Sequence, residues 1–335
     1  MPELRLNMIS REWVIIAREK SKKPEEFIGA REKKRHPEFV ETCPFCRGNE
    51  AKTPDERFRI PDGSTWKVRV VLNKFSVLSK DGDRSRTRTG IKQSINGVGT
   101  HEVIIESTAH NLTTATMTVE QIQYVIQTYK NRFLEAYRDP RIEHVVIFKN
   151  SGAVSGTAID HPLSQLVGIP ITPHQVRTRI EAAMRFFDDT GECLQCRTIG
   201  DELSDGSRVL MDTDHFVSFV PYAAVSPFHI WVFPKRHSGA FSDISADEAL
   251  DLARHMKTVL AKVHYGLANP DFNYIIKSGK PSHAASEYMH WYLTIIPRIA
   301  MTSGFELGSG IFINPLVPEI SADFLRNVKI PEYVR

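Results

Sequence analysis

Residues 43–46 read CPFC and residues 193–196 read CLQC, and these two C-x-x-C pairs contain all four cysteines of the 335-residue chain. The amino terminus, MPELRLNMISREW, lacks the apolar core of a secretory signal, so we expect a cytoplasmic protein. In a reducing compartment, a C-x-x-C pair binds a metal or performs redox chemistry more often than it forms a disulfide. The two pairs therefore point to metal or redox chemistry rather than to a disulfide framework.

The residues that follow CPFC help to choose between these chemistries. They are polar and include a proline, which indicates a loop rather than the strand-to-helix setting of a redox motif. Buried free thiols are the other alternative, but two separate C-x-x-C pairs favour metal binding. Two thiolates supply half of a tetrahedral zinc site, and histidines usually supply the rest.

An internal repeat indicates which histidines these are. Each half of the chain has the order C-x-x-C, strand, strand, His, helix, strand, His. Two histidines at matching places in two repeats are a stronger signal than one histidine near one cysteine pair. We expect two closed, structural zinc sites with no open position for water. The ligand sets are Cys43, Cys46, His110 and His161 in the first half, and Cys193, Cys196, His237 and His290 in the second.

The order of elements predicts an α+β fold in which each half is an antiparallel sheet with one long crossover helix. We place the boundary between the half-domains near residue 172, which gives half-domains 1–172 and 173–335. Capping boxes are expected at Thr118 with Gln121 and at Ser245 with Glu248. Helices are expected at 118–138, at 174–192 as a connection between the halves, at 246–267, and briefly after Pro318. Strands are expected at 68–73, 101–107, 144–150, 163–170, 216–221, 229–234, 273–278 and 292–299.

Composition excludes several classes of protein. An apolar fraction of 41% with 25% charged residues is ordinary for a soluble globular protein and excludes a mainly disordered chain. No stretch approaches the roughly 18–20 continuous apolar residues of a membrane span. The net charge is only +3, and the one basic run is REKKR at 31–35. We therefore expect no nucleic-acid partner and no membrane partner.

The segment FKNSGAVSGTAIDHPLSQLVGIP, residues 148–170, is the richest candidate for chemistry. Gly152 and Gly156 lie among small polar residues between two strands. Glycines let backbone N–H groups approach an anion closely, so the loop is a candidate phosphate nest, although such loops are more often simple turns. Gln165 is a polar residue in an otherwise apolar strand and needs a partner, which makes a site plausible there.

The whole pattern resembles the galactose-1-phosphate uridylyltransferase family, a branch of the histidine-triad superfamily built from two fused half-domains. The resemblance covers nearly the whole chain, including REWVIIAREKSKKP, the CPFC knuckle, VRVVLNKF, HEVIIESTAH and the N-x-G…H-P-x-x-Q segment. The tail HWYLTIIPRIAMTSGFELGSGIFINP is especially similar to the subgroup that acts on ADP-glucose or adenylylsulfate with phosphate as acceptor. That subgroup also has the second zinc set.

The resemblance implies a nucleotidyltransferase. Its substrate would be a nucleotide sugar or another adenylylated small molecule, its acceptor phosphate or a sugar phosphate, and its oligomeric state a homodimer. In relatives a histidine attacks the α-phosphorus and forms a nucleotidyl-histidine intermediate, which splits the transfer into two displacements. The hexose-pocket pattern of galactose-specific members is kept only at Gly304, Phe305 and Glu306, which favours phosphate as the acceptor. The base, uridine or adenosine, stays open.

The family's site residues carry over to matching positions of this chain. The resemblance assigns the first zinc set to the ligands given above. Gln165 matches the residue that hydrogen-bonds the transferring phosphoryl group in the family. For Asn73 and Asn150, the alternative to a ligand contact is capping of a turn or of a strand end. Nucleotide and phosphate contacts carry over to Asn73, Asn150, Gly152 and Gln165.

Leu163 departs from the family pattern because it stands where relatives have the nucleophilic histidine. Leucine has no lone pair and cannot form the intermediate, and the matching place in the second half is Tyr292. Ala158 also replaces a serine that contacts the phosphate in many relatives. Three explanations fit: an engineered His-to-Leu variant of an active enzyme, a naturally inactive nucleotide-binding family member, or direct in-line attack by phosphate.

Overall fold

The computed structural model describes residues 1–18, 22–29, 36–63 and 65–332, so the basic run at 31–35 and part of the REWVIIAREKSKKP segment lie outside the described residues. Its centre is one ten-stranded sheet in which every neighbouring pair is antiparallel. In spatial order the strands are β10 (Val209–Asp212), β11 (Phe216–Phe219), β12 (Ile230–Pro234), β14 (Tyr292–Pro297), β13 (Phe272–Lys277), β8 (His144–Ser151), β9 (Leu163–Ile169), β7 (Thr100–Ile105), β4 (Val68–Leu72) and β3 (Glu56–Ile60).

The strand order repeats about the middle of the sheet. From the centre outward, β8-β9-β7-β4-β3 in one half matches β13-β14-β12-β11-β10 in the other, and the halves meet where β8 pairs with β13. The expected α+β class with antiparallel strands is confirmed. The structure differs in one respect, because the expected two sheets form one continuous sheet. The division of the chain near residue 172 stays a prediction.

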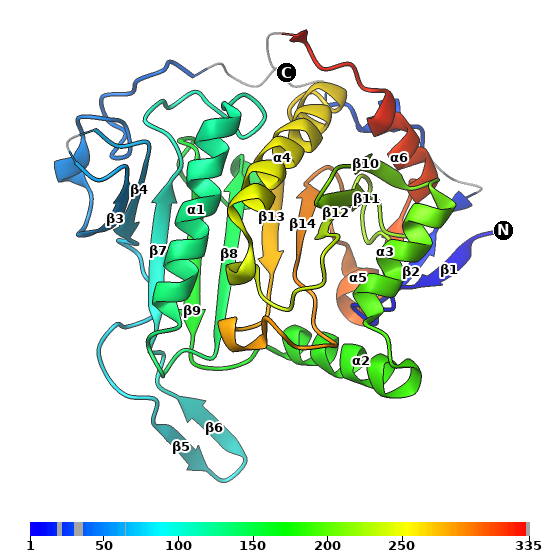
Figure 1. The fold of residues 1–335 in the computed structure, drawn as a ribbon, viewed down its shortest axis with the longest axis horizontal. Helices are drawn as coiled ribbons and strands as arrows, with labels where there is room; N and C mark the ends of the chain where they lie inside the picture. Colours follow the sequence, from blue (N-terminus) through cyan, green and yellow to red (C-terminus); the bar gives the residue numbers. More distant parts are fainter. Residues whose placement is uncertain (19–21, 30–35, 64, 333–335) are drawn as a thin grey trace.

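The helices lie on and around this sheet, with α1 and α4 side by side across it (Figure 1). The four expected helices are present as α1, α2, α4 and α6, whereas α3 and α5 were not expected. Cys193 is the N-cap of α3 and Cys196 lies in its first turn, so CLQC opens a helix while CPFC lies in turns. The helices are α1 (Val119–Ala136), α2 (His174–Thr190), α3 (Leu194–Asp205), α4 (Ala246–Gly266), α5 (Gly304–Ser309) and α6 (Pro318–Asn327).

Side-chain caps start the two long helices. The predicted capping box of α4 is confirmed, because Ser245 accepts from the Glu248 N–H and Glu248 accepts from the Ser245 N–H. Thr118 caps α1 in the same way by accepting from the Gln121 N–H. The reciprocal bond expected for Gln121 is absent, since its amide donates instead to main-chain carbonyls of the sheet region at 67 and 106.

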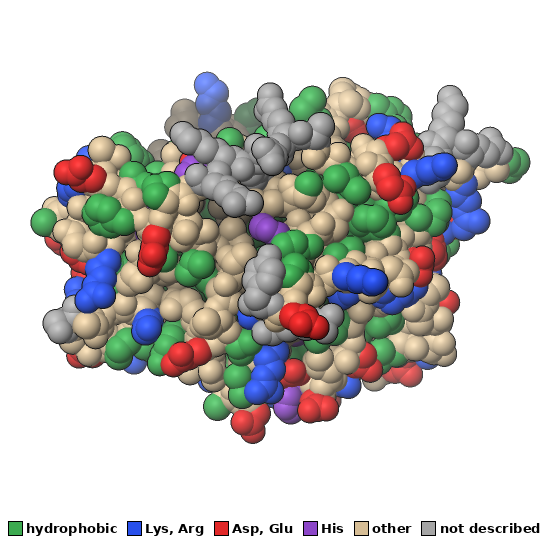
Figure 2. All heavy atoms as spheres, turned by 90° about the horizontal axis from the view of Figure 1, so that it is seen from above, with side chains coloured by type: hydrophobic (Ala, Val, Ile, Leu, Met, Phe, Trp, Pro, Cys, Tyr) green, Lys and Arg blue, Asp and Glu red, His purple; other side chains and the backbone are tan. Residues whose placement is uncertain are grey.

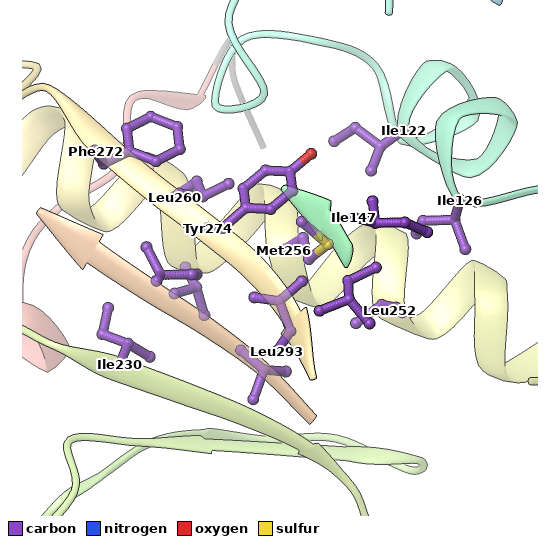
Figure 3. Close-up of a cluster of buried hydrophobic side chains, with 14 of the residues drawn as sticks. Ile122, Ile126, Ile147, Ile230, Leu252, Met256, Leu260, Phe272, Tyr274 and Leu293 are labelled. Atoms are coloured by element: carbon purple, nitrogen blue, oxygen red, sulfur yellow. The ribbon is translucent and has the colours of Figure 1, made fainter. Parts of the chain in front are cut away.

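The main core lies between α1, α4 and one face of the sheet. Figure 3 shows Tyr274 of β13 among Met256 of α4, Ile147 of β8 and Ile122 of α1. All four side chains are buried, and burying side chains of this size contributes about 1.5–3 kcal/mol each. Because strand residues alternate between faces, this packing leaves the other face, which carries Gln165 of β9, outside the main core.

Smaller elements surround the central sheet. A three-stranded sheet in the order β1-β2-β15 joins the amino terminus to the tail, and the hairpin β5–β6 projects from the body (Figure 1). No helix of the described residues is long and apolar enough to cross a membrane. The strands are β1 (Glu3–Leu6), β2 (Trp13–Ile16), β15 (Phe312–Asn314), β5 (Arg86–Thr89) and β6 (Lys92–Ile95). Short 3₁₀ turns occupy Pro24–Phe27 (η2), Glu50–Lys52 (η3), Ala153–Ser155 (η4), Phe241–Asp243 (η5) and Pro281–His283 (η6).

Candidate active site and metal centres

The four predicted ligands of the first half converge on one point. The ligand atoms of Cys43, Cys46, His110 and His161 lie within 4.8 Å of one another, and all four residues are buried. Cys46 Sγ lies 3.6 Å from His110 Nδ1, Cys43 Sγ lies 3.7 Å from His161 Nδ1, and the two Nδ1 atoms are 3.4 Å apart. A tetrahedral ion with bonds of about 2.3 Å to sulfur and 2.0–2.1 Å to nitrogen gives edges of about 3.5 and 3.4 Å. The donor set therefore fits a four-coordinate metal ion.

The hydrogen bonds of the first group agree with this geometry. His161 presents Nδ1 to the group while Nε2–H donates to the Ser107 carbonyl at 2.8 Å, which fixes the ring orientation and leaves a lone pair on Nδ1. Burial lowers the pKa of His161 to about 4, so the ring is neutral at neutral pH as a metal ligand must be.

The second half repeats the arrangement. The ligand atoms of Cys193, Cys196, His237 and His290 also lie within 4.8 Å of one another. Cys196 Sγ lies 3.3 Å from His237 Nδ1 and 3.4 Å from His290 Nδ1. Both rings donate from Nε2 to main-chain carbonyls, at Ser286 and Pro234. Both predicted sets are thus brought together by the fold, each able to hold a metal ion.

Strand β9 leads from the first metal group onto the open sheet face. Leu163 begins the strand two residues after His161 and is 6% exposed. It packs in an apolar cluster with Cys43, Cys46, Phe45, Trp66, Val71, Val103 and Ile105. Leu163 therefore adds to the apolar packing around the first Cys₂His₂ group.

Gln165 lies two residues further along β9, on the same sheet face as Leu163. Its Oε1 accepts from His101 Nε2 at 2.8 Å and from Asn73 Nδ2 at 3.4 Å. The Asn73 amide also lies 2.9 Å from His101 Nε2, and its Oδ1 accepts from the Phe75 N–H. The structure thus joins Asn73 and Gln165, as the family pattern implies, and places His101 between them. With Oε1 occupied, the Gln165 amide group is left to donate to a ligand oxygen.

Asn150 and Gly152 occupy the end of β8 and the loop after it. Asn150 Oδ1 accepts from Asn273 Nδ2 at 2.8 Å, and that amide also donates to the Ser155 carbonyl. Gly152 has a φ of +88°, and a side chain there would collide with the Asp271 carboxylate. Asp271 accepts from the Val154 N–H at 2.7 Å. Residues of the second half therefore fix the glycine loop of the first.

A buried polar network lies behind β9, on the face covered by α1. Lys149 forms an ion pair with Glu106, and both side chains are almost fully buried. Glu106 also accepts from the hydroxyls of Tyr129 and Tyr274, at 2.9 and 3.2 Å. The Lys149 ammonium donates to the Leu163 carbonyl at 3.2 Å. The network therefore fixes the main chain at Leu163.

Three residues of the site were not predicted from the sequence. His101 alternates with Val103 and Ile105 along β7, which indicates that the three side chains lie on one face of the sheet. A single histidine in a strand does not by itself indicate a functional site. Asn273 of β13 and Asp271, the residue before β13, belong to the other half and reach the loop only because β8 pairs with β13. A pairing between strands so far apart in sequence leaves no local pattern.

The fold and the site together define a class of protein. It is an α+β chain of two repeated halves, each with a Cys₂His₂ group. The first half also carries the glycine loop and Gln165. Residues 1–238 match the galactose-1-phosphate uridyl transferase N-terminal domain, and residues 179–328 match the C-terminal domain. The chain belongs to the galactose-1-phosphate uridyl transferase family of nucleotidyltransferases, which confirms the resemblance drawn from its motifs.

Relatives in this family span almost the whole chain. An ADP-glucose phosphorylase of Arabidopsis thaliana is 34% identical over 334 residues, covering 98% of this chain and 93% of that protein. A galactose-1-phosphate uridylyltransferase of Thermotoga maritima is 25% identical over 340 residues, covering 98% and 99%. The crystal structure of an Arabidopsis thaliana ADP-glucose phosphorylase with bound ADP-glucose superposes with a TM-score of 0.83 at 32% identity, covering 99% of this chain and all of that one.

The molecular surface agrees with a small-molecule site better than with a polymer-binding face. On the face shown in Figure 2, basic and acidic side chains are interspersed and do not form a basic stripe. The net charge of +3 is small for a nucleic-acid-binding protein of 335 residues. These features favour recognition by a few placed donors over attraction to a polyanion.

Proposed function

We propose that the chain binds a nucleoside diphosphate sugar, of which ADP-glucose is the first candidate, on the sheet face around Gln165. The observation that carries this proposal is the Gln165 network, in which His101 and Asn73 orient the amide next to the Asn150–Gly152 loop. Oriented donors and glycine-supported N–H groups are the means by which proteins hold phosphates. The ADP-glucose phosphorylase relative supports the choice of nucleotide, and phosphate is the proposed acceptor.

Leu163 determines what the site does with this ligand. An alkyl side chain cannot attack phosphorus, so the covalent route of the relatives is closed at this residue. We favour nucleotide-sugar binding without a nucleotidyl-enzyme intermediate. Direct attack by bound phosphate is the second candidate, since Gln165 and the glycine loop are kept and could position both reactants.

Other properties expected from the family belong to the same proposal. Zinc is the proposed metal of both Cys₂His₂ groups, because thiolate and imidazole donors in a closed tetrahedral set are typical of structural zinc. With four protein ligands, such an ion leaves no open position for substrate, so it would stabilise the fold near the site. A homodimer, a cytoplasmic location and the division into half-domains 1–172 and 173–335 are further proposals.

Calorimetry with ADP-glucose and UDP-glucose tests the binding proposal. We expect ADP-glucose to bind, and Gln165→Ala to weaken the affinity roughly tenfold, because a hydrogen bond to a charged group contributes about 1.5–3 kcal/mol. Gln127→Ala, an exposed glutamine on α1, is the matched control and should leave the affinity unchanged. Absence of binding, or equal affinities for the unaltered chain and Gln165→Ala, would show that this face is not the nucleotide site.

A further inference from the structure

A cavity lies on the open sheet face, mostly within the second half of the molecule. It has a volume of about 170 Å³ and lies between α2 and the strands β8, β13 and β14. This is far more than the roughly 10–15 Å³ that one water molecule needs. Its polar lining includes His144, Arg179, Lys277, Tyr292 and Gln195, and the candidate metal ligand His290 also lines it.

The cavity occupies the place in the second half that the Leu163–Gln165 face occupies in the first. Tyr292 follows the metal ligand His290 by two residues, as Leu163 follows His161. In both halves a histidine contacts a polar side chain of the neighbouring strand. His229 Nε2 lies 2.6 Å from Thr294 Oγ1, and in the first half His101 makes the matching contact with Gln165.

Lys277 has the place of Asn150 in this repeat. It pairs with Tyr292 across β13 and β14, and in the first half the β8–β9 register sets Asn150 opposite Leu163. An ammonium group therefore replaces a neutral amide at this position. At this position the second half therefore carries a positive charge, whereas the first half carries a neutral group.

The cavity is basic. Arg179 and Lys277 line it together with the His144 imidazole, and none of the described lining residues carries a carboxylate. Within the described residues, the side chains of these three residues have no hydrogen-bond or ion-pair partner. His144 is only 9% exposed overall, and its ring lines the cavity.

The charges in and around the cavity act on one another. Burial lowers the pKa of Lys277 to about 8, with the Arg179 guanidinium adding to the effect and the Glu12 carboxylate opposing it. Burial also lowers the pKa of His144 to about 4, with Arg179, Lys277 and Lys280 adding to it. A bound anion would relieve this repulsion between cations.

The amino-terminal end of α2 adds partial positive charge to the cavity. Pro173, the N-cap, and Gln175 and Val176 of this turn line the cavity, and among the described residues no side chain caps the helix. The free N–H groups at the start of a helix carry partial positive charge and favour anions. Here the helix end supplements the cationic side chains and does not stand alone.

We propose that this cavity is a second anion site, which binds inorganic phosphate or a phosphate monoester between Arg179, Lys277 and His144. The Tyr292 hydroxyl and the Gln195 amide are the neutral groups placed to complete its hydrogen bonds. The site is separate from the Gln165 face and does not rest on the function proposed for that face.

Titration calorimetry in a Gln165→Ala background isolates the second site. Inorganic phosphate and glucose 1-phosphate are titrated in parallel, and the tighter of the two identifies the source of the anion. We expect Arg179→Gln and Lys277→Gln each to weaken binding roughly tenfold or more. Arg177→Gln, on the same helix but exposed and outside the lining, is the matched control and should bind as the background does.

Two further measurements keep the result independent of misfolding. Arg179→Lys retains the charge and should recover most of the affinity, with melting curves recorded for every variant. In the chain labelled at histidine, addition of phosphate should move the His144 ring resonance. Absence of binding, equal affinities in Arg179→Gln and Arg177→Gln, or an unmoved His144 resonance would each overturn the proposal.

Discussion

Gln165 and Leu163 lie two residues apart on β9 and have opposite surroundings. Gln165 keeps two side-chain partners that orient its amide, whereas Leu163 packs against the apolar residues around the first metal group. A site that had lost all function would have no physical need to keep an oriented amide. These surroundings support the proposal that the face around Gln165 binds a ligand while Leu163 closes the covalent route.

Single functional residues could be predicted from the sequence best where the same residue pattern occurs in both halves. The convergence of the eight candidate metal ligands into two groups was predictable because the same order of cysteines and histidines occurs in both halves. Asn73 was predicted only through the family pattern, whereas Gln165 was also singled out as a polar residue in an otherwise apolar strand. His101 and Asn273 were not predicted, because their roles depend on neighbours across the sheet that the sequence does not reveal.

Buried neutral histidines make stability depend on pH. Burial lowers the pKa of His255 to about 4 and that of His229 to about 3, whereas unfolded histidine titrates near 6.5. Between these values the unfolded chain binds more protons, so stability is complete above about pH 6.5 and is lost as pH falls toward 4. From pH 7 to pH 5 the expected loss is roughly 2 kcal/mol for each histidine.

Urea denaturation at a series of pH values checks this expectation. His255→Met should give a shallower dependence of stability on pH, whatever its effect on stability at pH 7. His174→Gln, an exposed histidine at the start of α2, should keep the original slope. If His255→Met kept the full slope between pH 7 and pH 5, the buried ring would not be the cause.

At the scale of elements, local patterns predicted the long helices and the eight inner strands of the central sheet. The strands β1, β2, β3, β5, β6, β10 and β15 were not predicted. Apolar alternation and caps lie within each segment, and the start of α4 follows from Ser245 and Glu248 alone. The helix α3 was missed because its apolar positions are few and its amino terminus carries the metal ligands Cys193 and Cys196. The pairing of β8 with β13 was missed because it depends on contacts between distant parts of the chain.

The network behind β9 links one helix and three strands through a buried ion pair. Lys149→Met leaves the Glu106 carboxylate buried without its cation, so we expect a loss of roughly 3–5 kcal/mol in the free energy of unfolding. Equilibrium denaturation measures this loss. The double variant Lys149→Met/Glu106→Gln should recover part of it, because a neutral amide costs less to bury. Additive losses in the double variant would show that the two side chains are not coupled.

The whole molecule is best described as two copies of one unit that share a sheet. Each copy brings a Cys₂His₂ group to the equivalent strand end, and the second copy supports the glycine loop of the first through Asp271 and Asn273. The join explains why residues of both halves contribute to one site. It also explains why the second half has a cavity where the first has the candidate nucleotide face.

Metal removal should destabilise the whole chain, because a metal that binds only the folded state contributes folding energy. We expect two zinc ions per chain by elemental analysis, and one in either Cys43→Ser or Cys193→Ser. Chelation should lower the melting temperature of the unaltered chain, and restored zinc should reverse the shift. A chain without bound metal, or with a melting temperature indifferent to chelation, would contradict the assignment of these groups.

The central claim is that an intact family site binds its nucleotide sugar while Leu163 closes the covalent route. Intact-mass spectrometry of Leu163→His after incubation with ADP-glucose tests it most directly. The new imidazole should attack the α-phosphorus and break its bond to the bridging oxygen, releasing glucose 1-phosphate and adding one adenylyl group to the protein. The unaltered chain should bind ADP-glucose and gain no mass. A covalent adduct on the unaltered chain, or a folded Leu163→His variant that binds ADP-glucose and stays unlabelled, would contradict the account.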